Sequence, residues 1–280
     1  MMYGLIAMLG WGISNFFSGR LAKSIGFFPA LIAASAGTIS CLLLIMLAGK
    51  SPITMPQGSA LGFIFIAGGL LSVAGLAFYK GLEVGKISLL SPLAASWPIG
   101  IAVIAILSNQ SPFSPIKLLG IVLVTAGVLT ASVKRFEKNL NVSDPGIPYA
   151  ITALAAWVGA YYFFGRTLSG SSWVMFNVLF LLISVLFELA YARWKTLSIA
   201  WKPTRQNILY LVGCTVPSAA AFYYYSLGMR TGENTAVAVA TNANPVITVL
   251  LALTFLHEHL NRRQLTGIAM VIIGLILTNY

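Results

Sequence analysis

Ten stretches of this chain are apolar over about 20 residues each, which is the length that an α-helix needs to cross a lipid bilayer. Charged residues, or clusters of proline, glycine and serine, separate them. An outer-membrane barrel would instead show alternating apolar residues in strands of about ten residues. The sequence therefore predicts an all-α integral membrane protein with ten transmembrane helices, over 3–21, 29–48, 59–79, 88–107, 116–133, 147–166, 173–192, 207–228, 235–256 and 264–280.

The composition supports this class. Hydrophobic residues make up 58% of the chain and charged residues only 8%, far from the composition of soluble domains. The net charge is +11, but nearly all basic residues lie in the connections between apolar stretches, where they anchor helix ends and set topology. We therefore expect no nucleic acid partner. Cys41 and Cys214 lie inside apolar stretches, and neither a disulfide framework, a metal site nor a cofactor is predicted.

The second half of the sequence repeats the first at an offset of about 147 residues. Trp11 is followed eight residues later by a Gly-Arg pair that ends at Arg20, and Trp157 is followed in the same way by a pair that ends at Arg166. The predicted repeats are 1–133 and 147–280, joined by a charged linker over 134–146. Five spans per repeat is an odd number, so the second copy must enter the membrane inverted, with the working site between the copies.

Each half carries the same ordered set of motifs. The order is a tryptophan in the first span, Tyr-x-x-Leu at the end of the third, a proline in the fourth, and Leu-x-Gly-Ile with a later glycine in the fifth. The chain thus resembles the EamA-type repeat of the drug/metabolite transporter superfamily over nearly its whole length. The residues are Gly10-Trp11-Gly12, Tyr79 and Leu82, Pro98, and Leu118 to Gly127; then Trp157, Tyr224 and Leu227, Pro245, and Leu265 to Gly274.

The resemblance implies a ten-helix carrier with a central cavity between inverted repeats. Spans one, three, four, six, eight and nine are expected to line that cavity, and spans five and ten to pack at the periphery. One departure is that Glu258, which follows span nine as in the family, has Ser111 as its counterpart in the first half. The loop charges favour termini outside the cytoplasm, whereas the resemblance implies cytoplasmic termini, so the sidedness stays open.

Polar and aromatic residues share one stripe on the first span of each repeat. Trp11 and Asn15 are at helical spacing in span one, and Trp157 and Tyr161 occupy the corresponding stripe in span six. An amide inside a membrane needs a hydrogen-bond partner, which is either a neighbouring helix, cavity water or a substrate. Trp and Tyr join a flat apolar face to one polar group. We expect these four residues to border the cavity.

Spans four and nine carry matched prolines next to polar or aromatic side chains. In span nine the run holds Asn242, Asn244 and Pro245, and the counterpart in span four holds Trp97 and Pro98. A proline inside a helix removes one backbone hydrogen bond and kinks the helix. We interpret the prolines as hinges and the asparagines and Trp97 as cavity residues, although membrane helices also tolerate proline without a functional role.

Further candidates lie near helix ends. Arg20 and Arg166 are either snorkelling anchors or guards of the two mouths of the pathway. Tyr79 and Tyr224 end spans three and eight, where they either anchor the helices at the interface or contact the substrate. Glu188 is the acid closest to an apolar interior, and it is our first candidate for a residue protonated to couple transport to a proton gradient.

The expected function is secondary transport of a small neutral or zwitterionic metabolite, such as an amino acid, by alternating access, with export as the expected direction. The expected setting is the cell membrane, with a functional monomer in the lipid bilayer. An enzyme is not expected, since the His257-Glu258-His259 run has Asn261 where a metalloprotease helix needs its second histidine. The alternatives are a sugar or nucleotide-sugar porter, and a non-transporting or lipid-translocating membrane partner.

Overall fold

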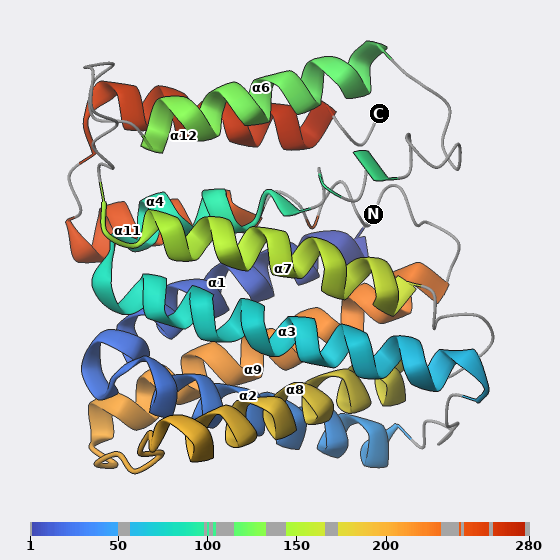
Figure 1. The fold of residues 1–280 in the computed structure, drawn as a ribbon. Helices are drawn as coiled ribbons and strands as arrows, with labels where there is room; N and C mark the ends of the chain where they lie inside the picture. The colour runs from blue at the N-terminus through green and yellow to red at the C-terminus, as the bar shows by residue number, and fades with distance from the viewer. Residues whose placement is uncertain are drawn as a thin grey trace.

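The computed structural model of the chain describes residues 2–49, 57–97, 100, 103–104, 115–132, 144–165, 173–230, 241, 244–257 and 260–277. Within these ranges it contains ten α-helices (Figure 1). In chain order they are α1 (Met2–Ile25), α2 (Phe27–Ala48), α3 (Ser59–Val84), α4 (Ile87–Ala94), α6 (Pro115–Ser132), α7 (Ile147–Gly165), α8 (Trp173–Lys195), α9 (Arg205–Arg230), α11 (Asn244–Leu256) and α12 (Arg262–Leu277).

The helices have the length and surface of membrane spans. Among the described residues, α2, α3, α7, α8 and α9 are each long and apolar enough to cross a bilayer. Large apolar side chains face outward along them, with Leu44 on α2 66% exposed and Phe65 on α3 57% exposed. Exposure of such apolar surface is unfavourable in water but not against lipid tails. The fold is thus an all-α, multi-pass membrane protein, as the sequence predicts.

The two halves pack on each other reciprocally. The helix α1 of the first half lies along α9 of the second, and α7 of the second half lies along α3 of the first. The helices α6 and α12, which close the two halves, lie side by side at one edge of the bundle (Figure 1). An exchange of partners of this kind is what a two-fold axis between repeats produces.

The contact between α6 and α12 shows this relation at the level of single residues. A Cβ atom on Gly127 would lie 2.6 Å from the carbonyl oxygen of Gly267, and a Cβ atom on Gly274 would lie 2.7 Å from the carbonyl oxygen of Gly120. Gly127 and Gly274 are equivalent positions in the two repeats, and so are Gly120 and Gly267. The two contacts are therefore the same contact made once from each half. Without side chains at these two positions the helix backbones approach closely.

Elsewhere the repeats differ in a complementary way. On α1, Gly12 faces the side chain of Ile247 on α11, and a Cβ atom added to Gly12 would lie 2.5 Å from the Cβ atom of Ile247. At the corresponding contact in the other half, Val158 on α7 packs into the space left by Gly100. The glycine and the branched residue have exchanged sides, so each contact still pairs one small and one large residue.

The helix α2 shows the same exchange in its contact with α9. A Cβ atom on Gly37 of α2 would lie 2.5 Å from the Cγ2 atom of Thr215 on α9. Between the corresponding helices α8 and α3, the branched residue is Ile183 on α8 and the glycine is Gly68 on α3, with a Cβ on Gly68 lying 2.5 Å from the Cγ2 atom of Ile183. Two independent helix crossings therefore use swapped small and large partners.

Span four, predicted over 88–107 with a kink at Pro98, is interrupted just before that proline. The helix α4 ends at Ala94, and Ala95 and Ser96 form a turn. The Ser96 hydroxyl donates a hydrogen bond to the carbonyl oxygen of Pro92 at 2.8 Å. A proline has no backbone N–H, so residue 98 cannot donate the helical hydrogen bond to the carbonyl oxygen of Ala94, where α4 ends. Pro98 itself lies outside the described residues.

The other matched proline does not interrupt the described part of its helix. Pro245 is the second residue of α11, which begins at Asn244. Thr241 is helical as well, and residues 242–243 lie outside the described residues. The predicted hinge at Pro245 therefore stays a prediction.

Asp144, at the end of the linker, ties the second half to the first. Its carboxylate accepts hydrogen bonds from the backbone N–H of Lys86 at 3.0 Å and of Gly146 at 2.8 Å, and its side chain is buried. We expect Asp144→Ala to destabilise the fold by about 2 kcal/mol or more, because two buried donors lose their acceptor. Thermal unfolding in detergent measures the loss. Asp144→Asn keeps one acceptor oxygen and should lose less; equal losses for both variants would contradict this role.

Candidate functional site

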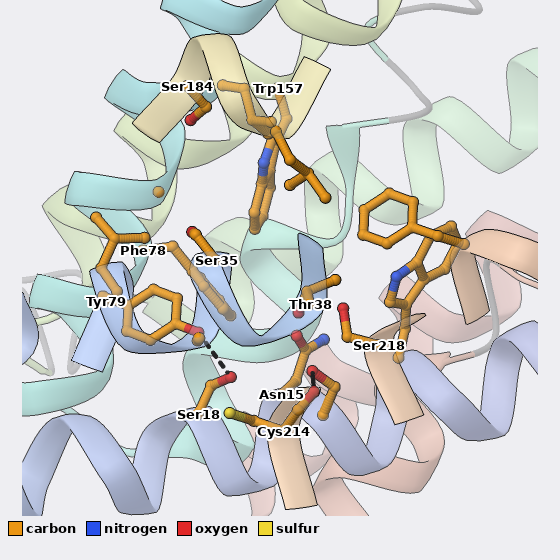
Figure 2. Close-up of a pocket in the computed structure, with 18 of the residues that line it drawn as sticks. Asn15, Ser18, Ser35, Thr38, Phe78, Tyr79, Trp157, Ser184, Cys214 and Ser218 are labelled. Carbon is orange, nitrogen blue, oxygen red and sulfur yellow. Dashed lines mark hydrogen bonds between the residues drawn. The ribbon is translucent and has the colours of Figure 1, made fainter. Parts of the chain in front are cut away.

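A cavity of about 170 Å³ lies at the centre of the bundle, with walls from both halves (Figure 2). A buried water needs at least about 10–15 Å³ by the same measure, so this space holds several waters or a small organic molecule. In Figure 2 the side chain of Trp157 stands on one side of the space, and Asn15, Ser18 and Cys214 stand on the opposite side.

Each helix that contributes to the lining turns one face to this cavity. The contributing residues recur three or four positions apart, which is the spacing of one helical stripe. They are Trp11, Ser14, Asn15 and Ser18 on α1; Leu31, Ala34, Ser35 and Thr38 on α2; Leu71, Gly75, Phe78 and Tyr79 on α3; Leu181, Ser184 and Glu188 on α8; and Cys214, Ser218 and Phe222 on α9. Ser91, Ala95 and Trp97 from α4 and its following turn, Trp157 and Tyr161 from α7, Thr241, and Asn244 from α11 complete the lining.

Aromatic rings form much of the wall. The rings of Trp97 and Tyr161 are stacked, with centroids 4.1 Å apart and planes at 12°. The rings of Trp157 and Phe78 are tilted, with centroids 5.0 Å apart. Each pair joins a residue of the first half to a residue of the second. The aromatic surface therefore spans the boundary between the repeats.

The two glycines that flank Trp11 let α1 approach two helices at once. A Cβ atom on Gly10 would lie 2.5 Å from the carbonyl oxygen of Pro217 on α9, and Gly12 is in similarly close contact with α11. Trp11 lies between these contacts and borders the cavity, with its ring edge-on to Phe222 at 5.3 Å between centroids. The Gly-Trp-Gly sequence thus fixes where the indole lies.

Polar side chains connect the helices around the cavity. The Asn15 amide donates to the side-chain oxygen of Asn244 at 3.4 Å, and the Asn244 amide donates to the carbonyl oxygen of Thr241 at 2.9 Å. The hydroxyls of Ser18 and Tyr79 share a hydrogen bond of 3.0 Å (Figure 2). Asn15 is therefore both a link between helices and a part of the cavity wall, which joins the two alternatives left open by the sequence.

Glu188 supplies the cavity with a carboxyl group. Its side chain is 1% exposed, and the Ser184 hydroxyl donates to its Oε1 atom at 2.9 Å. Its Oε2 atom is buried without a hydrogen-bond partner, and so is the hydroxyl of Ser91, which also borders the cavity. No lysine, arginine or histidine is among the lining residues that the structure describes. In the described ranges, no group of His, Cys, Asp and Glu side chains has the arrangement to hold a metal ion.

Tyr224 lies away from the cavity. The lining residues of α9 follow one stripe that ends at Phe222, and a residue two positions further along a helix points to the opposite side. The Tyr224 ring is instead stacked near the ring of Tyr3, with centroids 6.3 Å apart. The loose Tyr-x-x-Leu motif did not define the helix face closely enough to place this residue.

The hypothesised gating residues are only partly described. The Arg20 guanidinium donates to the Tyr210 hydroxyl through Nη2 at 2.6 Å and through Nε at 3.2 Å, and it does not border the cavity. Pro245 is buried beside the cavity residue Asn244 and is not itself in the lining. The candidates Arg166, Pro98 and Asn242 lie outside the described residues.

The sequence did not identify the contribution of spans two and seven, which are α2 and α8. Ser35 and Thr38 are small polar residues one helical turn apart in an otherwise apolar run, and that spacing was an available signal. The pair Ser184 and Glu188 repeats it on α8. The prediction that six spans line the cavity is thus incomplete, because α2 and α8 also face it.

Comparisons with known proteins agree with this architecture. The EamA-like transporter family matches residues 1–133 and 144–280. The uncharacterized transporter YvbV of Bacillus subtilis is 23% identical over 276 residues, which cover 96% of this chain and 88% of that protein. The multidrug resistance protein EbrA of Bacillus licheniformis is 29% identical over 102 residues, 36% of this chain and 93% of that protein. One solved crystal structure aligns with 99% of this chain and 94% of the chain in that structure, with a TM-score of 0.66 and 16% sequence identity.

Proposed function

Because the chain belongs to the EamA-like transporter family, we propose that it is a secondary transporter that moves a small neutral or zwitterionic metabolite, such as an amino acid, by alternating access. The family identifies a multi-pass membrane transporter. To this we add the solute class, the cell membrane as its location, export as the net direction, and a monomer as the functional unit. A monomer suffices because one chain contributes both halves of the cavity wall.

The observation that carries this proposal is the cavity bounded by residues of both halves. The halves pack reciprocally, with α1 on α9 and α7 on α3, so a rearrangement available to one half has a counterpart in the other. Exchange between two such arrangements would open the cavity alternately to the two sides of the membrane. Aqueous solutes would then cross without entering lipid, where their polar groups would lack hydrogen-bond partners.

The lining favours a solute with both polar and apolar parts. Amides and hydroxyls such as those of Asn15, Asn244 and Ser35 offer donors and acceptors, and the aromatic rings offer apolar surface. A sugar is the second candidate, because the stacked Trp97 and Tyr161 rings lie in the same wall as these hydrogen-bonding groups.

The first test is transport by the purified chain in proteoliposomes, measured as counterflow with a panel of amino acids, amines and sugars. We expect Asn15→Ala and Asn244→Ala each to reduce transport about tenfold, since each removes a hydrogen-bonding group from the cavity and breaks the Asn15–Asn244 link. Asn207→Ala is the matched control, because Asn207 accepts a hydrogen bond from Ser24 at the end of the bundle and does not border the cavity.

Transport at the parent rate in both cavity variants would show that this cavity is not the binding site. Loss of transport in Asn207→Ala to the same degree would show that the effect comes from helix packing rather than from the cavity. If the parent chain transports no solute of the panel, the proposed solute class is wrong.

A further inference from the structure

The carboxyl group of Glu188 has the properties of a binding group rather than of a packing residue. It is 1% exposed, it lies on the cavity face of α8, and its Oε2 atom has no hydrogen-bond partner. A buried polar atom without a hydrogen-bond partner is rare in proteins, so a water or a ligand is expected to bind it. An isolated buried carboxylate also carries a large desolvation cost unless a positive charge accompanies it.

No described residue supplies that positive charge. On α3, Gly75 faces the carboxyl group, and Leu31 on α2 packs against the same glycine. The titratable groups that share the cavity with Glu188 are the hydroxyls of Tyr79 and Tyr161 and the thiol of Cys214, and none of them is a cation. Within the described part of the wall, a positive partner for the carboxylate form would therefore come from what enters the cavity.

The surroundings of the carboxyl group suit an organic cation. The faces of Trp and Tyr rings attract cations through their quadrupole, and Trp11, Trp97, Trp157 and Tyr161 all border the same cavity as Glu188. An organic ammonium ion can use both kinds of group. The aromatic rings contact its alkyl part, and the carboxylate neutralises its charge.

Two neighbours surround the carboxyl group. The Ser184 hydroxyl, one turn earlier on α8, holds the Oε1 atom and leaves Oε2 free to accept. Gly75 on the facing helix lies close to the carboxyl group, since a Cβ atom there would lie 3.4 Å from Oε1 and 3.0 Å from the Cδ1 atom of Leu31. A side chain at position 75 would therefore narrow the approach to Glu188.

We propose that Glu188 is the counter-ion for a protonated amino group of the transported solute, so that the substrate class is small amines, zwitterionic amino acids included. The assignment rests on the proposed transport function; it narrows the zwitterionic solutes to those that carry an ammonium group and adds cationic amines to the class. Ser184 is a positioning residue in this arrangement, and the aromatic walls contact the remainder of the solute.

The test measures binding to the purified chain in detergent. Binding is detected as a change in the fluorescence of the tryptophans that border the cavity. The probes are phenethylamine, which is cationic, and 2-phenylethanol, which has a hydroxyl in place of the ammonium group. We expect the parent chain to bind phenethylamine at least tenfold more tightly than 2-phenylethanol. Glu188→Gln should remove this preference, and Glu188→Asp, which keeps the charge, should retain part of it.

The matched control is Glu83→Gln. Glu83 is a carboxylate of the same type that pairs with Lys80 at the end of α3, outside the cavity, so its loss changes the net charge equally. This variant should bind phenethylamine as the parent does. Ser184→Ala should weaken phenethylamine binding without changing the affinity for 2-phenylethanol. Thermal unfolding of each variant separates a loss of binding from a loss of folding.

Equal binding of both probes by the parent chain would overturn the proposal, and so would phenethylamine binding that Glu188→Gln leaves unchanged. If Glu188→Gln alters only the response of transport to a proton gradient, the carboxyl group carries protons and the amine site is wrong. Counterflow in proteoliposomes distinguishes the two proposals: charge-selective binding without transport of any solute would refute the transport function and leave the amine site standing.

Discussion

Replacing Gly12 by valine is expected to remove most of the folded protein. The Cβ atom would lie 2.5 Å from the Cβ atom of Ile247 and 2.9 Å from the carbonyl oxygen of Asn244, closer than atoms pack. The helices α1 and α11 would have to separate, and the buried hydrogen bond from the Thr248 hydroxyl to the Gly12 carbonyl, 2.9 Å long, would be lost. Overpacking of this kind costs about 1–3 kcal/mol, to which the lost hydrogen bond adds. Size-exclusion chromatography and thermal unfolding in detergent measure the result.

The opposite half of the molecule suggests how to reverse this loss. Gly12→Val combined with Ile247→Gly reproduces the pairing of Val158 with Gly100, in which the large residue is on the first helix of the repeat. We expect the double variant to recover a clear part of the lost stability. Gly62→Val is the matched control, because a Cβ atom there would meet nothing within 4 Å. A double variant no more stable than Gly12→Val alone would show that the exchange of sizes does not govern this contact.

Replacing Trp157 by alanine is expected to reduce transport at least tenfold. The indole is half-buried, borders the cavity, and packs against Phe78 across the boundary between the repeats. Its removal enlarges the cavity and takes away an aromatic face that a solute can contact. Replacement of a wholly buried tryptophan by alanine costs about 3–5 kcal/mol, so this half-buried ring should lower stability by less. Counterflow and thermal unfolding, measured on the same preparation, separate the two effects.

Two variants make the Trp157 experiment selective. Trp157→Phe keeps an aromatic face and should retain most of the transport. Trp194→Ala removes an indole that is 73% exposed and contacts Lys195 outside the cavity, and it should transport as the parent does. Full transport by Trp157→Ala would mean that this wall does not contact the solute, and a defect in Trp194→Ala would mean that any loss of tryptophan impairs the protein.

The sequence predicted the helices well because their length is dictated by the bilayer. The predicted span 29–48 is α2 over Phe27–Ala48, and 147–166 is α7 over Ile147–Gly165. Span four is the exception, since hydropathy does not register the turn at Ala95 and Ser96: the residues there are as apolar as in a continuous helix. The proline pattern did signal a kink in this span, and the turn lies two residues before Pro98.

The site was predictable to the extent that one helix could be considered alone. Trp11, Asn15 and Trp157 border the cavity because they lie on a single stripe of α1 or α7, although their contact with a solute stays a prediction. Which face of α9 turns inward depends on the neighbouring helices, so the sequence left Tyr224 as either an interface anchor or a substrate contact, and the structure places it outside the cavity lining. The same dependence concealed the cavity face of α8, where Glu188 lies.

The exchange of small and large partners also bears on how such a chain could have arisen and whether its halves can still be separated. A chain made of two first halves would set a residue like Gly12 against a residue like Gly100 and leave a void, whereas two second halves would press the equivalents of Val158 and Ile247 together. At this contact neither half is complementary to a copy of itself. A homodimer of one repeat would need residues of intermediate size here, whereas the two halves of this chain carry complementary surfaces.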